Sequence, residues 1–202
     1  MKIHQCKDYE EVSKTAADWF IQKVKENPLS KIGIATGNSP LEMYRHISKT
    51  ASQHTTALSL FQLDEWVGLS KNQHSCRSFI EKEVRIPWGI PVDSTHYFSP
   101  SLHLTSKIQA EPGEKWPPNA CYVSALAPST QNHTMILSEQ TPPTIGVTLG
   151  IKSILQAKEI LFIVTATGKT AAYTQWLTKE ITPSLPASIL WKHPKVTLVT
   201  DL

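Results

Sequence analysis

Apolar residues recur at helical spacing near the start of the chain. Between Val12 and Val24 they fall every three or four positions, the period of one buried helix face. Asp8 followed by Glu11 forms a capping-box pattern ahead of this stretch, and Pro28 ends it. The pattern therefore predicts a first amphipathic helix that begins just after Asp8.

Short continuous apolar runs then alternate with further helical patterns. The runs predict buried strands at residues 31–35, 58–63, 160–165 and 196–200, and helices are predicted at residues 40–49, 148–157 and 169–180. Strands that are apolar on both faces and alternate with helices predict an α/β fold, a doubly wound, mostly parallel sheet with helices on both faces. Because 202 residues with 40% hydrophobic content can bury one substantial core, residues 1–202 are predicted to form a single domain.

One stretch interrupts this alternation. Residues 99–120 contain no strand-like run, and their four prolines break any helix longer than about two turns. A structureless loop of roughly 20 residues is unusual inside a compact domain. Either this loop is functional, or an element expected there is missing.

Composition excludes several classes of partner. The net charge of +3 is mild, and no basic run interleaved with aromatic residues indicates a nucleic-acid groove. No apolar stretch approaches the roughly 20 residues that span a bilayer, and the N-terminus lacks the apolar region of a signal peptide. Cys6, Cys76 and Cys121 lie far apart, as expected for reduced thiols of a cytoplasmic protein. The oligomeric state stays open, a homo-oligomer included.

The first candidate site is the turn after the strand at 31–35. Ligands of parallel α/β sheets bind beyond the carboxyl ends of strands, and Thr36, Gly37, Asn38 and Ser39 occupy such an end. Ser39 followed by Pro40 predicts a capped helix start, whose backbone N–H groups and positive end suit a phosphate. An ordinary capped turn without a ligand is the alternative.

Two further strand ends carry charged side chains. Asp64 follows a buried strand, where partial burial raises a carboxylate pKa and suits a proton acceptor; an ordinary turn aspartate is the alternative. Lys169 falls in the first turn of a helix, where the macrodipole opposes a cation unless an anion lies between them. A solvated surface lysine is the alternative there.

Other chemistries lack support in the sequence. The eight histidines show no H-E-x-x-H or paired ligand spacing, so neither zinc nor another metal is expected. There is no G-x-S-x-G motif, and no cysteine has a recognisable histidine partner for nucleophilic catalysis.

Taken together, several segments resemble the glucosamine-6-phosphate deaminase family, and most of all its galactosamine-6-phosphate deaminase/isomerase branch. The resemblance is carried by residues 32–44 (IGIATGNSPLEMY), 61–69 (FQLDEWVGL), 129–135 (STQNHTM), 146–169 and 185–199 (LPASILWKHPKVTLV). It covers most of the chain in the correct order, and the LDEWVGL block together with the ATGNSP turn is specific.

The resemblance implies a Rossmann-like deaminase/isomerase fold and an enzyme that needs neither metal nor organic cofactor. Its substrate would be glucosamine-6-phosphate or galactosamine-6-phosphate, which is deaminated and isomerised to a ketose 6-phosphate with release of ammonia. By the family match Asp64 is the acid/base that removes the C2 proton. The turn at residues 36–39 and Lys169 match the phosphate-binding positions.

The chain also departs from the family pattern. Members carry a strand and a Gly-His segment whose histidine assists ring opening; here only residues 110–114 (AEPGE) resemble its tail, with Glu111 at the family's glutamate position. One strand–helix unit therefore has no counterpart, nor does a phosphate-binding arginine before Gly146. Loss of a central strand exposes two strand edges. The alternatives are a catalytically weak or inactive sugar-phosphate-binding homologue and, on the same fold, a 6-phosphogluconolactonase.

Overall fold

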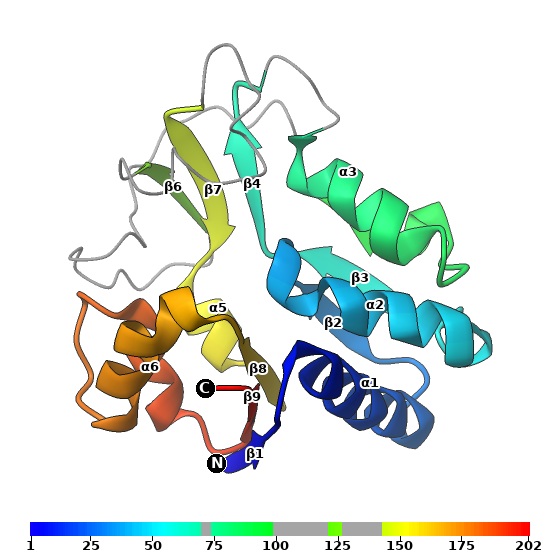
Figure 1. Ribbon diagram of the computed structural model, residues 1–202. Helices are drawn as coiled ribbons and strands as arrows, with labels where there is room; N and C mark the ends of the chain where they lie inside the picture. Colours follow the sequence, from blue (N-terminus) through cyan, green and yellow to red (C-terminus); the bar gives the residue numbers. More distant parts are fainter. Residues whose placement is uncertain (70–73, 99–120, 127–142) are drawn as a thin grey trace.

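The computed structural model describes residues 1–69, 74–98, 121–126 and 143–202, with strands and helices alternating along the chain (Figure 1). The strands are β1 Lys2–Gln5, β2 Lys31–Ile34, β3 Ser59–Gln62, β4 Asp64–Val67, β5 Thr95–His96, β6 Cys121–Ala125, β7 Ile145–Leu149, β8 Ile160–Val164 and β9 Val196–Thr200. The α-helices are α1 Tyr9–Glu26, α2 Asn38–Thr50, α3 Cys76–Ile80, α5 Ile151–Leu155 and α6 Thr170–Leu177. A π-helical turn at Glu81–Arg85 continues α3, and 3-10 turns lie at Ser52–His54, Val92–Ser94, Thr167–Lys169 and Pro186–Lys192.

The strands form three sheets of three strands each. Two of them, in the orders β1-β9-β8 and β2-β3-β5, are parallel throughout, and the third, β4-β7-β6, is antiparallel. The mostly parallel α/β fold expected from the sequence is therefore confirmed. Within the described part of the chain, β2 and β8 pair on one side only and form sheet edges.

One hydrophobic core joins the two parallel sheets. Helices α1 and α2 pack against each other, and both contact β8 (Figure 1). The buried cluster beneath them includes Ile34 of β2, Leu60 of β3 and Val199 of β9, with the half-buried Ile163 of β8 against it. The helices thus hold together two sheets that share no strand pairing among the described residues.

Helix α1 forms where the capping pattern places it. The Asp8 carboxylate accepts a hydrogen bond from the Glu11 backbone N–H at 2.9 Å, and the Glu11 carboxylate accepts one from the Lys7 backbone N–H at 2.9 Å. These bonds satisfy backbone donors at the helix start. The face buried in the core carries Val12, Ala16, Ala17, Phe20 and Val24.

The helix after the first candidate turn begins earlier than predicted. Gly37, not Ser39, is the N-cap of α2, so Ser39 and Pro40 already lie inside the first turn. The local capping pattern suggested Ser39, but the left-handed backbone at Gly37, with φ at 95°, ends the extended segment sooner. The helix predicted at 169–180 is likewise shorter and spans Thr170–Leu177.

The helix predicted at 148–157 is wrong in its first part. Residues up to Leu149 belong to strand β7, and the helix spans only Ile151–Leu155. Likewise β3 ends at Gln62, while Asp64 begins strand β4 in another sheet. Both differences arise from one long-range pairing, Asp64 opposite Thr148, which local periodicity does not encode. Within the described residues, no helix is long and apolar enough to cross a membrane.

Candidate active site

The turn between β2 and α2 has a backbone that favours glycine. Gly37 adopts a φ of 95°, in the left-handed region that residues with a Cβ rarely enter. It caps a helix of 13 residues, whose N-terminal end carries partial positive charge. The neighbouring Thr36 and Ser39 are half-buried, and Asn38 is exposed.

Lys169 meets this turn from a distant part of the chain. Its Nζ donates a hydrogen bond to the Ser39 Oγ at 2.9 Å, although 130 positions separate the two residues. Lys169 ends the 3-10 turn after β8, directly before α6. The structure therefore joins two of the three strand ends singled out in the sequence.

The backbone before Lys169 is strained. Ala166 has a φ of 77°, which is unfavourable for a residue with a Cβ. Its carbonyl accepts a hydrogen bond from the Lys169 backbone N–H at 3.0 Å, which closes the turn. Such strain persists where surrounding contacts fix the chain, and here it directs Lys169 toward α2.

Asp64 is the third strand-end residue. Its Oδ1 is shielded from solvent and has no hydrogen-bond partner within the described residues. Burial, and to a smaller extent the neighbouring Glu65 carboxylate, raises the pKa of Asp64 from 3.8 to about 6. The nearby Cys76 side chain has a smaller effect that lowers this pKa. A carboxylate with such a pKa is ionised at neutral pH and still basic enough to accept a proton.

Glu65 anchors this part of the site. Its two carboxylate oxygens accept hydrogen bonds from the Gln62 amide at 2.8 Å and from the backbone N–H groups of Trp66, Cys76 and Arg77 at 2.9, 2.8 and 2.9 Å. The carboxylate therefore ties strand β4 to the first turn of α3. Asp64 and Cys76 are held at fixed positions as a result.

Cys76 connects the turn at residues 36–39 to Glu65, the neighbour of Asp64. The Thr36 hydroxyl donates a hydrogen bond to the Cys76 Sγ at 3.4 Å, and the Cys76 backbone N–H donates to the Glu65 carboxylate at 2.8 Å. Burial, followed by the Asp64 charge, raises the Cys76 pKa far above its ordinary value, so the thiol stays protonated. The three candidate strand ends are thus connected, the second of them through Glu65.

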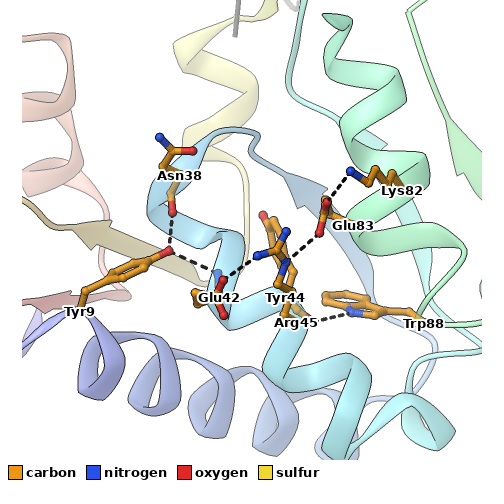
Figure 2. A network of polar contacts seen from close by, with 8 residues as sticks. All are labelled: Tyr9, Asn38, Glu42, Tyr44, Arg45, Lys82, Glu83 and Trp88. Atoms are coloured by element: carbon orange, nitrogen blue, oxygen red, sulfur yellow. Dashed lines mark hydrogen bonds and ion pairs between the residues drawn. The ribbon is translucent and has the colours of Figure 1, made fainter. Parts of the chain in front are cut away.

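Tyr9 braces the N-terminus of α2 (Figure 2). Its hydroxyl donates a hydrogen bond to the Asn38 carbonyl and accepts one from the Glu42 backbone N–H at 3.3 Å. In a regular helix those two backbone groups bond to each other. The Tyr9 hydroxyl therefore bridges the first turn of α2 and fixes it against α1.

The far side of α2 is held in the same way (Figure 2). Arg45 forms ion pairs with Glu42 at 2.8 Å and with Glu83 at 3.0 Å, and the Trp88 indole N–H donates to the Tyr44 carbonyl at 3.1 Å. The Tyr44 hydroxyl in turn donates to the Ala35 carbonyl at 2.8 Å. The helix that carries the turn is thus fixed from α1, from Glu81–Arg85 and from its own preceding strand.

Most of the residues singled out in the sequence come together. Residues 36–39 and Lys169 meet directly, and the segment of Asp64 and Glu65 is linked to the turn through the Glu65–Cys76 and Cys76–Thr36 hydrogen bonds. Glu111 lies outside the described residues. Sequence reasoning missed Tyr9, Glu65 and Cys76. A signal existed for Cys76, because Ser75 and Ser78 follow a helix-capping spacing, and the Ser75 Oγ accepts from the Ser78 N–H at 3.0 Å.

The described residues contain no group of three or more histidine, cysteine, aspartate or glutamate side chains placed to hold a metal ion. The arrangement instead suits proton transfer and anion binding. It combines an enclosed carboxylate of raised pKa with a cationic side chain beside a helix N-terminus.

Solved structures place this fold in a known class. A structure titled as a monomeric glucosamine-6-phosphate deaminase, "missing link of the NagB superfamily", superimposes with a TM-score of 0.89 at 24% identity, over 99% of this chain and 97% of that one. The 6-phosphogluconolactonase from Trypanosoma brucei matches with a TM-score of 0.73 at 15% identity, over 99% and 96% of the two chains. The fold is therefore the Rossmann-like α/β fold that these proteins share.

The sequence comparison is more specific. The glucosamine-6-phosphate deaminase of Shouchella clausii is 30% identical over 100% of this chain and 95% of its own length, and that of Geobacillus sp. (strain WCH70) is 28% identical over 100% and 93%. No family model matches the chain. At this identity and coverage, the chain belongs to the glucosamine-6-phosphate deaminase family, as its motifs indicated.

The alignment also bears on the strand–helix unit of the family that has no counterpart in this sequence. It spans 235 positions with the Shouchella clausii protein, whereas this chain has 202 residues, so at least 33 aligned positions find no residue here. A difference of this size is enough for a strand and a helix.

Proposed function

We propose that the chain deaminates and isomerises an amino-sugar 6-phosphate, either glucosamine-6-phosphate or galactosamine-6-phosphate. The products are a ketose 6-phosphate and ammonia. The observation that carries this proposal is the series of hydrogen bonds from Lys169 to Ser39 in the turn, from Thr36 to Cys76, and from Cys76 to Glu65, the neighbour of Asp64. Membership of the deaminase family supports the same reaction.

The binding step is assigned to the turn and to Lys169. Backbone N–H groups of residues 36–39 and the Lys169 ammonium would hold the 6-phosphate, because a helix N-terminus and a cation both favour a dianion. The bond between Lys169 and Ser39 orients the ammonium toward the turn. This arrangement predicts that the free sugar binds far more weakly than its 6-phosphate.

The chemical step is assigned to Asp64. It would take the proton from C2 of the open-chain sugar and return it to C1, which converts the amino aldose to an imine at C2. Water then adds to C2 and ammonia leaves as the C–N bond breaks, which gives the ketose. Glu111 is proposed to assist at the family's glutamate position. Since the chain has no counterpart to the ring-opening histidine, the open chain must form spontaneously, and turnover is expected to be slow.

Exchange of the C2 hydrogen with deuterated solvent tests the chemical step. The wild type should exchange slowly but measurably, while Asp64→Asn keeps the shape but cannot accept the proton and should abolish exchange without weakening sugar-phosphate binding. Mass spectrometry of the recovered sugar measures the exchange, and calorimetry the binding. If Asp64→Asn exchanges as fast as the wild type, Asp64 is not the base.

Substitution of Lys169 tests the binding step. Lys169→Ala should weaken binding of the sugar 6-phosphate by about 1.5–3 kcal/mol, the contribution of a charge-assisted hydrogen bond. Lys25→Ala is the matched control, because this lysine is exposed in the last turn of α1. Equal losses in both variants, or none in Lys169→Ala, would remove Lys169 from the site.

A second candidate function follows from the missing unit. With at least 33 aligned positions unmatched, the chain could bind sugar phosphates without turning them over. Binding without C2 exchange or ammonia release in the wild type would select this alternative. Hydrolysis of 6-phosphogluconolactone instead would select the lactonase chemistry named for the structural neighbour of lower identity.

A further inference from the structure

Asp64 lies where the chain leaves one sheet and enters another. Strand β3 of the parallel sheet β2-β3-β5 ends at Gln62, and Asp64 is the first residue of β4 in the antiparallel sheet β4-β7-β6. The turn assigned to the phosphate follows β2 and belongs to the parallel sheet. Pairing within either sheet does not fix Asp64 relative to that turn, because these two sheets share no strand pairing among the described residues.

We propose that Glu65 is a positioning residue, which fixes the Asp64 carboxylate relative to the phosphate-binding turn. The inference rests on the function proposed above, because it treats Asp64 and the turn as parts of one site. Glu65 follows Asp64 directly in β4, and its carboxylate accepts a hydrogen bond from the Gln62 amide at 2.8 Å. This bond spans the junction between the two sheets and joins the residues on either side of it.

The Glu65 carboxylate also binds the start of the next helix. One oxygen accepts from the backbone N–H groups of Trp66 and Cys76, at 2.9 and 2.8 Å. The other accepts from the Arg77 backbone N–H at 2.9 Å and from the Gln62 amide. A carboxylate suits this position because it only accepts, whereas a protonated carboxyl or an amide would bring a donor against one of these N–H groups.

Further bonds hold the junction from the neighbouring strands. The Gln62 Oε1 accepts the Phe98 backbone N–H, just after β5, at 3.0 Å. From β7, the Leu149 N–H donates to the Leu63 carbonyl at 2.7 Å. Gln62 is 4% exposed, so the loss of a partner leaves a buried polar group unsatisfied. The segment that carries Asp64 is therefore held from β5, β7 and α3, and Glu65 supplies the contact with α3.

Glu65 also acts on Asp64 through its charge. The titratable groups that act on the Asp64 carboxylate are Glu65 on β4, Cys76 on α3 and Tyr44 on α2, while Thr148 lies opposite it on β7 and does not titrate. Burial is the main cause of the raised Asp64 pKa, and Glu65 adds to it because like charges disfavour each other. Aspartate at position 65 would keep this charge on a shorter side chain, so position and charge can be separated.

Two substitutions of Glu65 test the proposal. Glu65→Asp keeps the charge but is one methylene too short to reach all four donors, and Glu65→Gln keeps the length but cannot accept from all of them. Both should slow C2 exchange at saturating sugar 6-phosphate by about 10–100-fold, the cost of a misplacement of about 1 Å. The calorimetric affinity for the sugar 6-phosphate should change little, because Glu65 does not contact the turn or Lys169.

Titration of the Asp64 carboxyl carbon by NMR needs no turnover. With carboxyl-labelled aspartate, the Asp64 signal is identified by its absence in Asp64→Asn. The titration midpoint should fall by about half a unit in Glu65→Asp, because a looser segment admits water to the carboxylate, and by about one unit in Glu65→Gln, which also removes the like charge. The acidic limb of C2 exchange should move in the same order.

Glu81→Asp is the matched control. The Glu81 carboxylate also accepts several hydrogen bonds, but from Arg85 and Tyr97, which lie outside β3, β4 and the first turn of α3. The variant should lower the stability of the protein and leave both C2 exchange and the Asp64 midpoint at their wild-type values. A loss of stability alone therefore does not reproduce the expected result.

If Glu65→Asp does not fold, Gln62→Met decides, since it removes the bond across the junction and leaves Glu65 in place. It should move C2 exchange and the Asp64 midpoint in the same directions. Wild-type values of both in these variants, or an effect of Glu65→Gln alone, would overturn the inference, because charge without position would then suffice. Absence of C2 exchange in the wild type would instead refute the proposed function, and the order of the midpoints would still test Glu65.

Discussion

At the scale of single residues, the enclosure of Asp64 has two opposite effects. It raises the carboxyl pKa to about 6, which suits a general base, and it places a charge where water does not reach Oδ1. An enclosed ionised group without full hydrogen bonding destabilises the folded state. The burial that suits Asp64 to the proposed role of base should therefore lower the stability of the protein at neutral pH.

This cost predicts that Asp64→Asn stabilises the protein in a pH-dependent way. The folded-state pKa, about 6, lies above the ordinary 3.8, so the folded state binds the proton more tightly and loses stability as pH rises between these values. At pH 7.5 the variant should unfold with a free energy up to about 3 kcal/mol higher than the wild type, and the gain should shrink toward pH 4.

Denaturant unfolding at pH 4.5 and 7.5 measures this difference. Asp18→Asn serves as the control, because Asp18 lies exposed on α1 and should change stability little at either pH. A gain that is the same at both pH values would show that burial does not raise the Asp64 pKa.

Gly37 allows a second test at this scale. Gly37→Ala should destabilise the protein by about 1–3 kcal/mol and weaken sugar-phosphate binding, because its φ of 95° strains any residue with a Cβ. Steric overlap does not contribute to this destabilisation, because a Cβ added at Gly37 meets no described atom within 4 Å. Gly168→Ala is matched: its Cβ also meets nothing, its φ lies outside the left-handed region, and it should change stability little. Equal unfolding free energies for the two variants would contradict the backbone argument.

At the scale of elements, the phosphate-binding function proposed for the β2–α2 turn depends on how α2 is held. Tyr9 of α1 contributes through one hydroxyl that bridges the Asn38 carbonyl and the Glu42 N–H. We expect Tyr9→Phe to lower the free energy of unfolding by about 0.5–1.5 kcal/mol, the contribution of a hydrogen bond. It should also weaken sugar-phosphate binding, because the first turn of α2 loses its brace.

Tyr97→Phe separates the two effects. It also removes a bonded hydroxyl, since Tyr97 donates to the Glu81 carboxylate, but neither partner of that bond belongs to α2. Calorimetry should show weaker binding for the Tyr9 variant alone, while both variants unfold more easily. Unchanged binding in Tyr9→Phe would mean that the turn keeps its shape without the brace.

Local sequence patterns predict best those helices and strands whose first and last residues do not depend on pairing with distant parts of the chain. Helix α1 and strands β2, β8 and β9 follow the expected positions, because capping residues and continuous apolar runs determine them. The antiparallel sheet β4-β7-β6 was not predicted. Its strands exist through pairings such as Glu65 with Val147, between residues far apart in the sequence. Residues 145–149 are rich in β-branched residues, which favour a strand, but their local pattern does not reveal which strand is the partner.

The candidate site shows the same contrast between local pattern and long-range contacts. The turn at 36–39, Asp64 and Lys169 could be predicted, because each lies at the end of an apolar run and matches a family motif. For Cys76 the sequence offered only the capping spacing of Ser75 and Ser78, which marks a helix start, whereas its contact with Thr36 joins distant segments. A buried thiol has the sequence signature of an ordinary small apolar residue.

At the scale of the whole molecule, the two parallel sheets are held together by helices and side chains. Strand β9 pairs with β1 on one side and β8 on the other, and all five of its residues are buried. By contrast β2 and β8 each have one partner within the described residues, and β2 is exposed at Lys31 and Gly33. Edges of this kind expose backbone N–H and C=O groups to water.

This difference predicts a pattern of amide hydrogen exchange. The amides of β9 should exchange slowest, near the rate set by global unfolding, because both of its edges are paired. In β2 and β8 the amides on the unpaired side should exchange much faster than those bonded to β3 and β9. NMR-detected exchange resolves the alternating pattern, since successive amides of a strand point to opposite sides.

The same amide exchange rates are then measured at two protein concentrations. Fast exchange that is independent of concentration means that helices α1 and α2 alone hold the two sheets together, as their shared core indicates. If β2 and β8 were as protected as β9 at every concentration, another segment of the chain would cover their edges. Protection that appears only at high concentration would show instead that a second copy pairs there, because an unpaired edge is a template for another strand.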